Sequence, residues 1–189
     1  MHGIALTAEP SWRPAAAGEA PQAVHFLIEA SGESGDRPAV SLGLLLDRSG
    51  SMEGEKLTHL KRAVEAVVNA LTPEDRLAVI AFDDEVDVLV PLAPLTDREG
   101  ALARIRALIP RGGTQIGQAL ERGLAALMPE AKGGRPCRLV LLTDGETWGD
   151  EAACEKAAAA ARTSGVPLVT LGLGEDWNES LLMRLADAS

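Results

Sequence analysis

The sequence predicts an α/β protein with a doubly wound, mainly parallel sheet that is covered by helices on both faces. Short, nearly uniformly apolar segments alternate along the chain with longer segments in which apolar side chains recur at helical spacing. Strands that are buried on both faces have this uniform apolar character, which is typical of parallel sheets. Polar residues also follow several apolar segments directly, at the strand ends where such sheets bind their ligands.

The first elements come after a stretch without sustained periodicity. Residues 1–21 are rich in Ala, Pro and Gly, so we expect a flexible N-terminal arm. Residues 24–30 have the composition of a strand, and the turn-rich residues 31–36 end it. Residues 40–46 are almost entirely apolar, so we expect them to form a buried strand of the main sheet.

Helices and strands then alternate to the end of the chain. Apolar residues at helical spacing predict a helix over residues 55–71, which Thr72 and Pro73 end. The same reasoning predicts strands at residues 76–82, 86–90, 138–143 and 167–171, and helices at residues 97–108, 116–128, 150–163 and 179–188.

Composition limits the class of protein. With 189 residues, of which 46% are hydrophobic and 24% charged, the chain is long enough for one substantial core. The net charge of −10 and the absence of a basic cluster argue against a nucleic-acid partner.

No segment has the length and apolar character of a signal peptide or a membrane span, so we expect a cytoplasmic protein without a membrane partner. Cys137 and Cys154 lack metal-type spacing, and we expect reduced packing residues.

Oxygen-bearing side chains follow three of the predicted elements. Asp47, Ser49 and Ser51 come directly after the strand at residues 40–46, Thr114 precedes a helix, and Asp144 follows the strand at residues 138–143. Mg²⁺ prefers an octahedron of oxygen ligands at about 2.0–2.1 Å and retains some of its waters. The carboxyl ends of parallel strands meet at one edge of a sheet, so these residues predict a metal site there.

These segments resemble the von Willebrand factor type A domain with its metal-ion-dependent adhesion site. Residues 47–52 match the Asp-x-Ser-x-Ser signature of that family, Gly113 and Thr114 match its threonine loop, and residues 143–145 match the segment of its second aspartate. The match covers roughly residues 38–175, in the order and separation of the family.

The resemblance implies a bacterial, intracellular, non-enzymatic protein-binding module. It implies a Mg²⁺ ion, with Mn²⁺ as an alternative, held by Ser49, Ser51 and Thr114, while Asp47 and Asp144 contribute directly or through water. A metal opposed by few carboxylates keeps an open position for an Asp or Glu side chain of a protein partner. Intracellular members of the family commonly belong to larger assemblies, including complexes with AAA-type ATPases.

The resemblance also bears on the domain boundaries. We expect residues 38–189 to form the von Willebrand factor type A domain, truncated at its C-terminus because the chain stops on a predicted helix where a strand could follow. Residues 22–37 would add a strand and a turn. Two placements stay open for that strand: a short antiparallel edge of the main sheet, which we favour, or part of a neighbouring β-sandwich.

Residues beside the predicted site are candidates for partner contact. Trp148 could anchor a partner or pack against the next helix, and Arg48 could steer an acidic partner or be merely solvated. Gly113 would let the backbone approach the ligand closely. We expect residues 83–85, Asp-Asp-Glu, to form a solvated turn.

Two other functions are alternatives to an intracellular protein-binding module. One is a surface adhesion module of an exported protein, which the missing signal segment argues against. The other is a Mg²⁺-dependent phosphohydrolase, but the acid/base Asp expected two residues after Asp47 is replaced by Ser49. No P-loop, dinucleotide fingerprint or nucleophile elbow occurs in the sequence.

Overall fold

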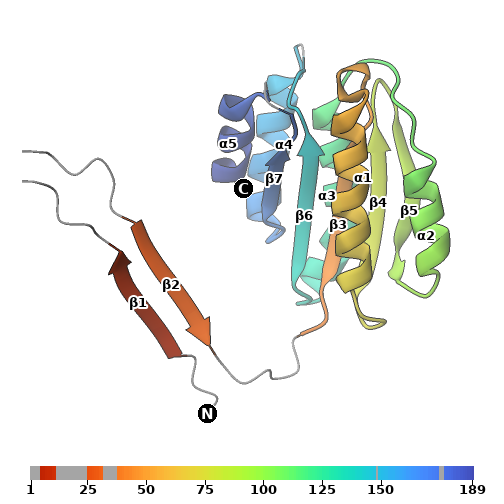
Figure 1. Cartoon of the computed structure of the whole chain (residues 1–189). Coiled ribbons are helices and arrows are strands. Elements are labelled where there is room, and N and C mark those ends of the chain that lie inside the picture. Colours follow the sequence, from red (N-terminus) through yellow and green to blue (C-terminus); the bar gives the residue numbers. More distant parts are fainter. Residues whose placement is uncertain (1–4, 12–24, 32–37, 148, 175–176) are drawn as a thin grey trace, which may run out of the picture. The chain divides into compact units, whose positions relative to one another are not determined.

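A computed structural model of the chain describes residues 5–11, 25–31, 38–147, 149–174 and 177–189. The chain divides into two compact units, residues 1–37 and 38–189. Figure 1 shows the elements of both units. In chain order they are β1 (Ala5–Ser11), β2 (His25–Ser31), β3 (Ser41–Asp47), a short 3₁₀ helix η1 (Gly50–Met52), α1 (Glu55–Ala70), β4 (Arg76–Phe82), β5 (Val86–Pro94), α2 (Arg98–Arg106), α3 (Ile116–Lys132), β6 (Cys137–Thr143), α4 (Glu151–Thr163), β7 (Leu168–Gly172) and α5 (Glu179–Ala188).

The second unit is built on a five-stranded sheet with the strand order β5-β4-β3-β6-β7. β3 lies in the centre and pairs in parallel with both β4 and β6, and β6 pairs in parallel with β7. β5 pairs antiparallel with β4 and forms one edge. The predicted fold class is therefore confirmed, including the antiparallel edge strand.

The core lies on both faces of this sheet, because successive side chains of the central strand point in opposite directions. Leu45 packs on one face with buried residues of α3, α4 and α5. Leu44 and Leu46 pack on the other face with buried residues of α1 and α2. Figure 1 shows α1 and α2 in front of the sheet. This double cover explains why the strand at residues 41–47 carries almost no polar side chains before Asp47.

The antiparallel edge is not the strand that the sequence analysis favoured. Residues 25–31 form β2, which pairs antiparallel with β1 in a separate two-stranded sheet. Residues 5–11 of the expected flexible arm form β1, and the rest of that arm lies outside the described residues. β1 was not predicted because its Ala- and Pro-containing sequence has weak strand propensity. It forms a strand by pairing with β2, which begins 14 residues after β1 ends.

Two elements, β5 and α3, run four residues past their predicted ends, and proline is involved in both. β5 continues to Pro94 and includes Pro91, which an edge strand tolerates because one side of its backbone has no ladder partner. α3 continues through Pro129 to Lys132. Pro129 lies in the last turn of α3, and the residue four positions earlier, Ala125, is exposed, so water can satisfy the carbonyl that loses its helical partner. Among the described residues, no helix is long and apolar enough to cross a membrane.

The start of α3 lies very close to α4. A Cβ atom at Gly117 would lie 2.7 Å from Cβ of Ala153 and 3.1 Å from its backbone carbonyl carbon. The backbone N–H of Gly117 also donates a 2.6 Å hydrogen bond to the carboxylate of Asp150. Only glycine fits at this position without moving one helix away from the other.

We expect Gly117→Ala to lower the free energy of unfolding by about 1–3 kcal/mol, because overpacking outweighs the higher helix propensity of alanine. Glu121→Ala on the exposed side of α3 is the control, and it should change the free energy by less than about 0.5 kcal/mol. Urea denaturation of both variants measures the difference. An unchanged or higher stability of Gly117→Ala would show that the two helices separate freely.

Candidate metal centre

The predicted site residues come together at the carboxyl ends of β3 and β6. β3 ends at Asp47, and β6 ends at Thr143, directly before Asp144. Because β3 and β6 are neighbouring parallel strands, these two ends lie side by side. Ser49 and Ser51 follow β3 in the short turn that begins η1. Thr114 comes from a different direction, in the loop that leads into α3.

Asp47 is fully buried, and its carboxylate accepts hydrogen bonds from Ser49 and Thr143. The backbone N–H of Ser49 donates to Oδ1 at 2.8 Å, and the hydroxyl of Thr143 donates to Oδ2. Burial raises the pKa of Asp47 from 3.8 to about 6, although these hydrogen bonds and a side-chain bond with Ser49 oppose the rise, and the nearby charge of Asp144 adds to it. Both aspartates therefore lie close enough to repel each other when ionised.

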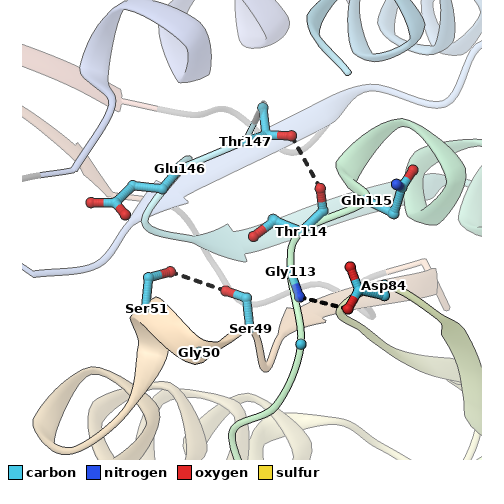
Figure 2. A pocket seen from close by; sticks show the side chains of 10 residues that line it. Ser49, Gly50, Ser51, Asp84, Gly113, Thr114, Gln115, Glu146 and Thr147 are labelled. Carbon is cyan, nitrogen blue, oxygen red and sulfur yellow. Dashed lines mark hydrogen bonds between the residues drawn. The ribbon is translucent and has the colours of Figure 1, made fainter. Parts of the chain in front are cut away.

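The hydroxyl groups surround a pocket above this end of the sheet. Its volume is about 330 Å³, and Ser49, Ser51 and Thr114 are among its lining residues, whereas Asp47 and Asp144 are not. Figure 2 shows the two serines opposite the loop that carries Thr114. The Oγ atoms of Ser49 and Ser51 are 3.1 Å apart. The hydroxyls thus face the pocket, and both carboxylates are buried with no solvent-accessible surface.

Asp144 is also fully buried, and three groups hold it. Its Oδ2 accepts a 2.8 Å hydrogen bond from the ammonium of Lys56, on the first turn of α1. Its Oδ1 accepts from the backbone N–H of Glu146 at 3.1 Å, and its carbonyl accepts from the backbone N–H of Asn178 at 2.7 Å. The side chain is therefore fixed from two sides.

The loop that carries Thr114 is fastened to the ends of β3 and β4. Backbone hydrogen bonds join Arg111 N to Arg48 O at 2.8 Å and Gly50 N to Gly112 O at 3.0 Å. The backbone N–H of Gly113 donates to Oδ2 of Asp84 at 2.8 Å. At Gly112, φ is 66°, and a Cβ atom there would lie 2.5 Å from Asp84. A glycine is required at this position because both the backbone angle and the space exclude other side chains.

Arg48 does not face solvent, contrary to the suggestion that it steers a partner. Its residue exposure is 7%, and its guanidinium donates to the carboxylates of Asp83 and Asp87. Arg111 donates to Asp83 as well, at 2.7 Å. Two acidic side chains draw Arg48 inward: Asp83, directly after β4, and Asp87, on β5.

The expected solvated turn at residues 83–85 is only partly solvated. Asp83 is 2% exposed, while Asp84 and Glu85 are exposed. Burial alone would raise the pKa of Asp83, but hydrogen bonds from Arg111, the Glu85 backbone and Arg48 outweigh it and lower the pKa. Asp83 and Asp84 instead form the support of the Thr114 loop.

The other candidates for partner contact are Trp148 and Gly113. Trp148 lies outside the described residues. Gly113 lines the pocket through its backbone. Cys137 and Cys154 are free and buried, as expected for packing residues, and burial raises the pKa of both thiols.

The donor set fits a small divalent cation. Two adjacent ligands of an octahedral ion with bonds of about 2.1 Å lie about 3.0 Å apart, which agrees with the 3.1 Å between the oxygens of Ser49 and Ser51. In the described part of the chain, no group of three or more His, Cys, Asp or Glu side chains is arranged to hold a metal. The site therefore depends on hydroxyl oxygens, which suit Mg²⁺ or Mn²⁺ better than zinc.

Several residues of this site were missed in the sequence analysis. Lys56, Asp84 and Thr143 contact the predicted site residues, and Glu146 and Thr147 line the pocket. Glu146 and Thr147 could have been found from their positions two and three residues after Asp144. Lys56 carried no such signal, because its ammonium reaches Asp144 across 88 positions of sequence.

Comparisons with known proteins place this arrangement in a family. The profile of the von Willebrand factor type A domain matches residues 42–189. An uncharacterised protein of Synechocystis is 32% identical over 165 residues, which are 86% of this chain and 39% of that protein. A von Willebrand factor type A structure from Catenulispora acidiphila superposes with a TM-score of 0.68 at 25% identity, over 87% of this chain and 39% of the other. Manganese-loaded TRAP protein of Plasmodium vivax superposes with a TM-score of 0.70 at 18% identity, over 99% of this chain and 68% of that one.

The chain belongs to the von Willebrand factor type A domain family. Domains of this family are protein-interaction and adhesion modules, and its members are mostly non-enzymatic. The chain spans about two fifths of the length of its Synechocystis relative. The family thus gives the class of protein.

The pKa of Asp47 predicts how the stability of the metal-free protein depends on pH. Because the pKa is higher in the folded than in the unfolded chain, the folded protein binds the proton more tightly, and in EDTA its stability should fall as the pH rises from about 4 through about 6. The contribution is about 3 kcal/mol. Asp47→Asn removes this titration, so the unfolding free energy of the wild type should fall relative to that of Asp47→Asn as the pH rises over that range.

Urea denaturation in EDTA at several pH values between about 4 and 7.5 measures this difference. Glu121→Ala, far from the site on an exposed helix face, should follow the wild type at every pH. Parallel curves for the wild type and Asp47→Asn would contradict the raised pKa.

Proposed function

We propose that this chain is a protein-binding module that captures an Asp or Glu side chain of a partner protein through a divalent metal ion. Ser49, Ser51 and Thr114 would hold the ion, Mg²⁺ or alternatively Mn²⁺, and Asp47 and Asp144 would contribute directly or through water. When bound, the ion supplies a Lewis-acidic position that accepts an external carboxylate. The observation that carries the proposal is the gathering of three hydroxyls around one pocket beside two fully buried carboxylates.

The charges of the site favour an external acidic ligand. Asp144 is already paired with Lys56, so of the proposed ligands only Asp47 has a carboxylate charge that no described cation offsets, and these ligands alone do not fully neutralise a dication. The carboxylates of Asp84 and Glu146 line the pocket wall as well, and Asp84 accepts a hydrogen bond from the backbone N–H of Gly113. The hydroxyls that line the pocket are neutral. A carboxylate from a partner would complete both the charge balance and the coordination, and this makes capture dependent on the metal.

The shape of the pocket also supports a protein ligand. Gly50, Gly112 and Gly113 line one side of it, so the backbone leaves room for a side chain to enter from outside. The firm attachment of the Thr114 loop to Asp84 means that this side of the site is formed before a partner arrives. Such preorganisation lowers the entropic cost of binding.

The setting that we propose is an intracellular, cytoplasmic assembly, including one built with a AAA-type ATPase. This part of the proposal is based on the resemblance to intracellular family members. A surface adhesion role would use the same metal site, so fractionation of cells that express the full-length protein separates the two settings.

Removal of one hydroxyl ligand should weaken metal binding. We expect Ser51→Ala to lower the affinity for Mn²⁺ by about tenfold or more, because one inner oxygen is lost from the site. Isothermal titration calorimetry with Mn²⁺ alone measures the affinity. Thr58→Ala, which removes an exposed hydroxyl on α1 away from the pocket, should bind Mn²⁺ like the wild type. Equal affinities of the two variants would argue against the proposed ligand set.

Partner capture should depend on the metal and on Thr114. We expect the wild-type protein with Mg²⁺ to retain a partner from extracts of its source cell, and EDTA or Thr114→Ala to abolish that retention. Thr163→Ala is the matched control, because its hydroxyl is exposed and donates to the carbonyl of Ala160 on α4. A partner retained equally with EDTA would contradict a metal-bridged carboxylate.

A further inference from the structure

Lys56 is the only cationic side chain that the described contacts place on either buried aspartate of the site. Its ammonium lies 2.8 Å from Oδ2 of Asp144. The Asp144 side chain is completely buried, and the Lys56 side chain is 24% exposed. A buried carboxylate requires compensation of its charge, and Lys56 supplies it within the protein itself.

The path of the Lys56 side chain is restricted. The loop after β7 approaches it so closely that a Cβ atom at Gly174 would lie 2.6 Å from Cε of Lys56 and 3.3 Å from its Cδ. The same loop is joined to β6 by a 3.0 Å hydrogen bond from Leu173 N to Thr143 O. The aliphatic part of Lys56 therefore runs past Gly174 towards the end of β6, which directs the ammonium at Asp144.

The position of Lys56 in its helix is unfavourable for the helix alone. It lies in the first turn of α1, where the positive end of the helix dipole disfavours cations and favours acids such as the neighbouring Glu55. Helix stability thus gives no reason for a lysine at this position. The ion pair with Asp144 does give a reason for a lysine there.

We propose that Lys56 is a tethered counter-ion of the metal site. Building on the proposed function, we infer that its ammonium compensates the charge of the buried Asp144 carboxylate in the absence of a divalent cation and lowers the affinity of the site when that cation is present. Both positive charges are attracted to the same carboxylate and repel each other across a short distance in a poorly solvated place. Lys56 then keeps the domain folded without metal, and it makes metal binding weaker and more easily reversed.

Lys56→Met tests this inference, because methionine keeps much of the length of the side chain but removes the charge. We expect Lys56→Met to bind Mn²⁺ about tenfold more tightly than the wild type. We expect its melting temperature in EDTA to be lower, since Asp144 is left buried without its counter-ion. Increasing Mn²⁺ should remove that difference in melting temperature.

The matched control is Lys61→Met on the same helix. Lys61 also carries one positive charge, but its ammonium donates to the carbonyls of Arg106 and Leu108 rather than to a carboxylate of the site. Its Mn²⁺ affinity should equal that of the wild type. Lys56→Gln provides a second uncharged variant, measured in the same way, in case Lys56→Met does not fold.

The outcomes are distinguishable. Tighter Mn²⁺ binding by Lys56→Met or Lys56→Gln, but not by Lys61→Met, together with a lower melting temperature in EDTA, supports the inference. If the wild type binds Mn²⁺ and the Lys56 variants bind it no more tightly than Lys61→Met, the inference is overturned and the proposed function stands. If the wild type binds no Mn²⁺, both are overturned.

Discussion

The site depends on the burial of two carboxylates at the ends of neighbouring parallel strands. Asp47 and Asp144 have no exposed surface, and each charge raises the cost of the other. The surrounding structure compensates in different ways: hydrogen bonds from Ser49 and Thr143 support Asp47, and an ammonium supports Asp144. The first turn of α1 takes part in this compensation directly, because it carries Lys56.

The fold and the meeting of the candidate ligand residues at one sheet edge could be predicted from the sequence because both depend on short-range patterns. The uniformly apolar strands at residues 41–47 and 137–143 predict a doubly covered parallel sheet, and the sheet alone brings the residues that follow them to one edge. β5 was predicted too short because its end contains Pro91 and Pro94, which are atypical of strands, although it continues along the neighbouring β4. β1 was not predicted because its own composition has weak strand propensity.

The contacts around the site could not be predicted in the same way. Whether Arg48 points to solvent or into the protein depends on where Asp83 and Asp87 lie after the chain has folded, and Lys56 meets Asp144 only through the packing of α1 beside β6. A motif specifies which residues reach a place in the fold. The direction of the long, charged side chains next to the motif depends on their tertiary partners. Because of these partners, Arg48 is buried instead of exposed, and the turn at residues 83–85 supports the Thr114 loop instead of being fully solvated.

The prolines of β5 have a consequence for the solution behaviour of the domain. Pro91 and Pro94 cannot donate backbone hydrogen bonds, so this border of the sheet is a poor template for a strand from another molecule. The opposite border, β7, contains no proline and exposes Val169 and Leu171 to 36% and 45%. Self-association of this domain under stress should therefore be directional, with misassembly beginning at β7 and not at β5.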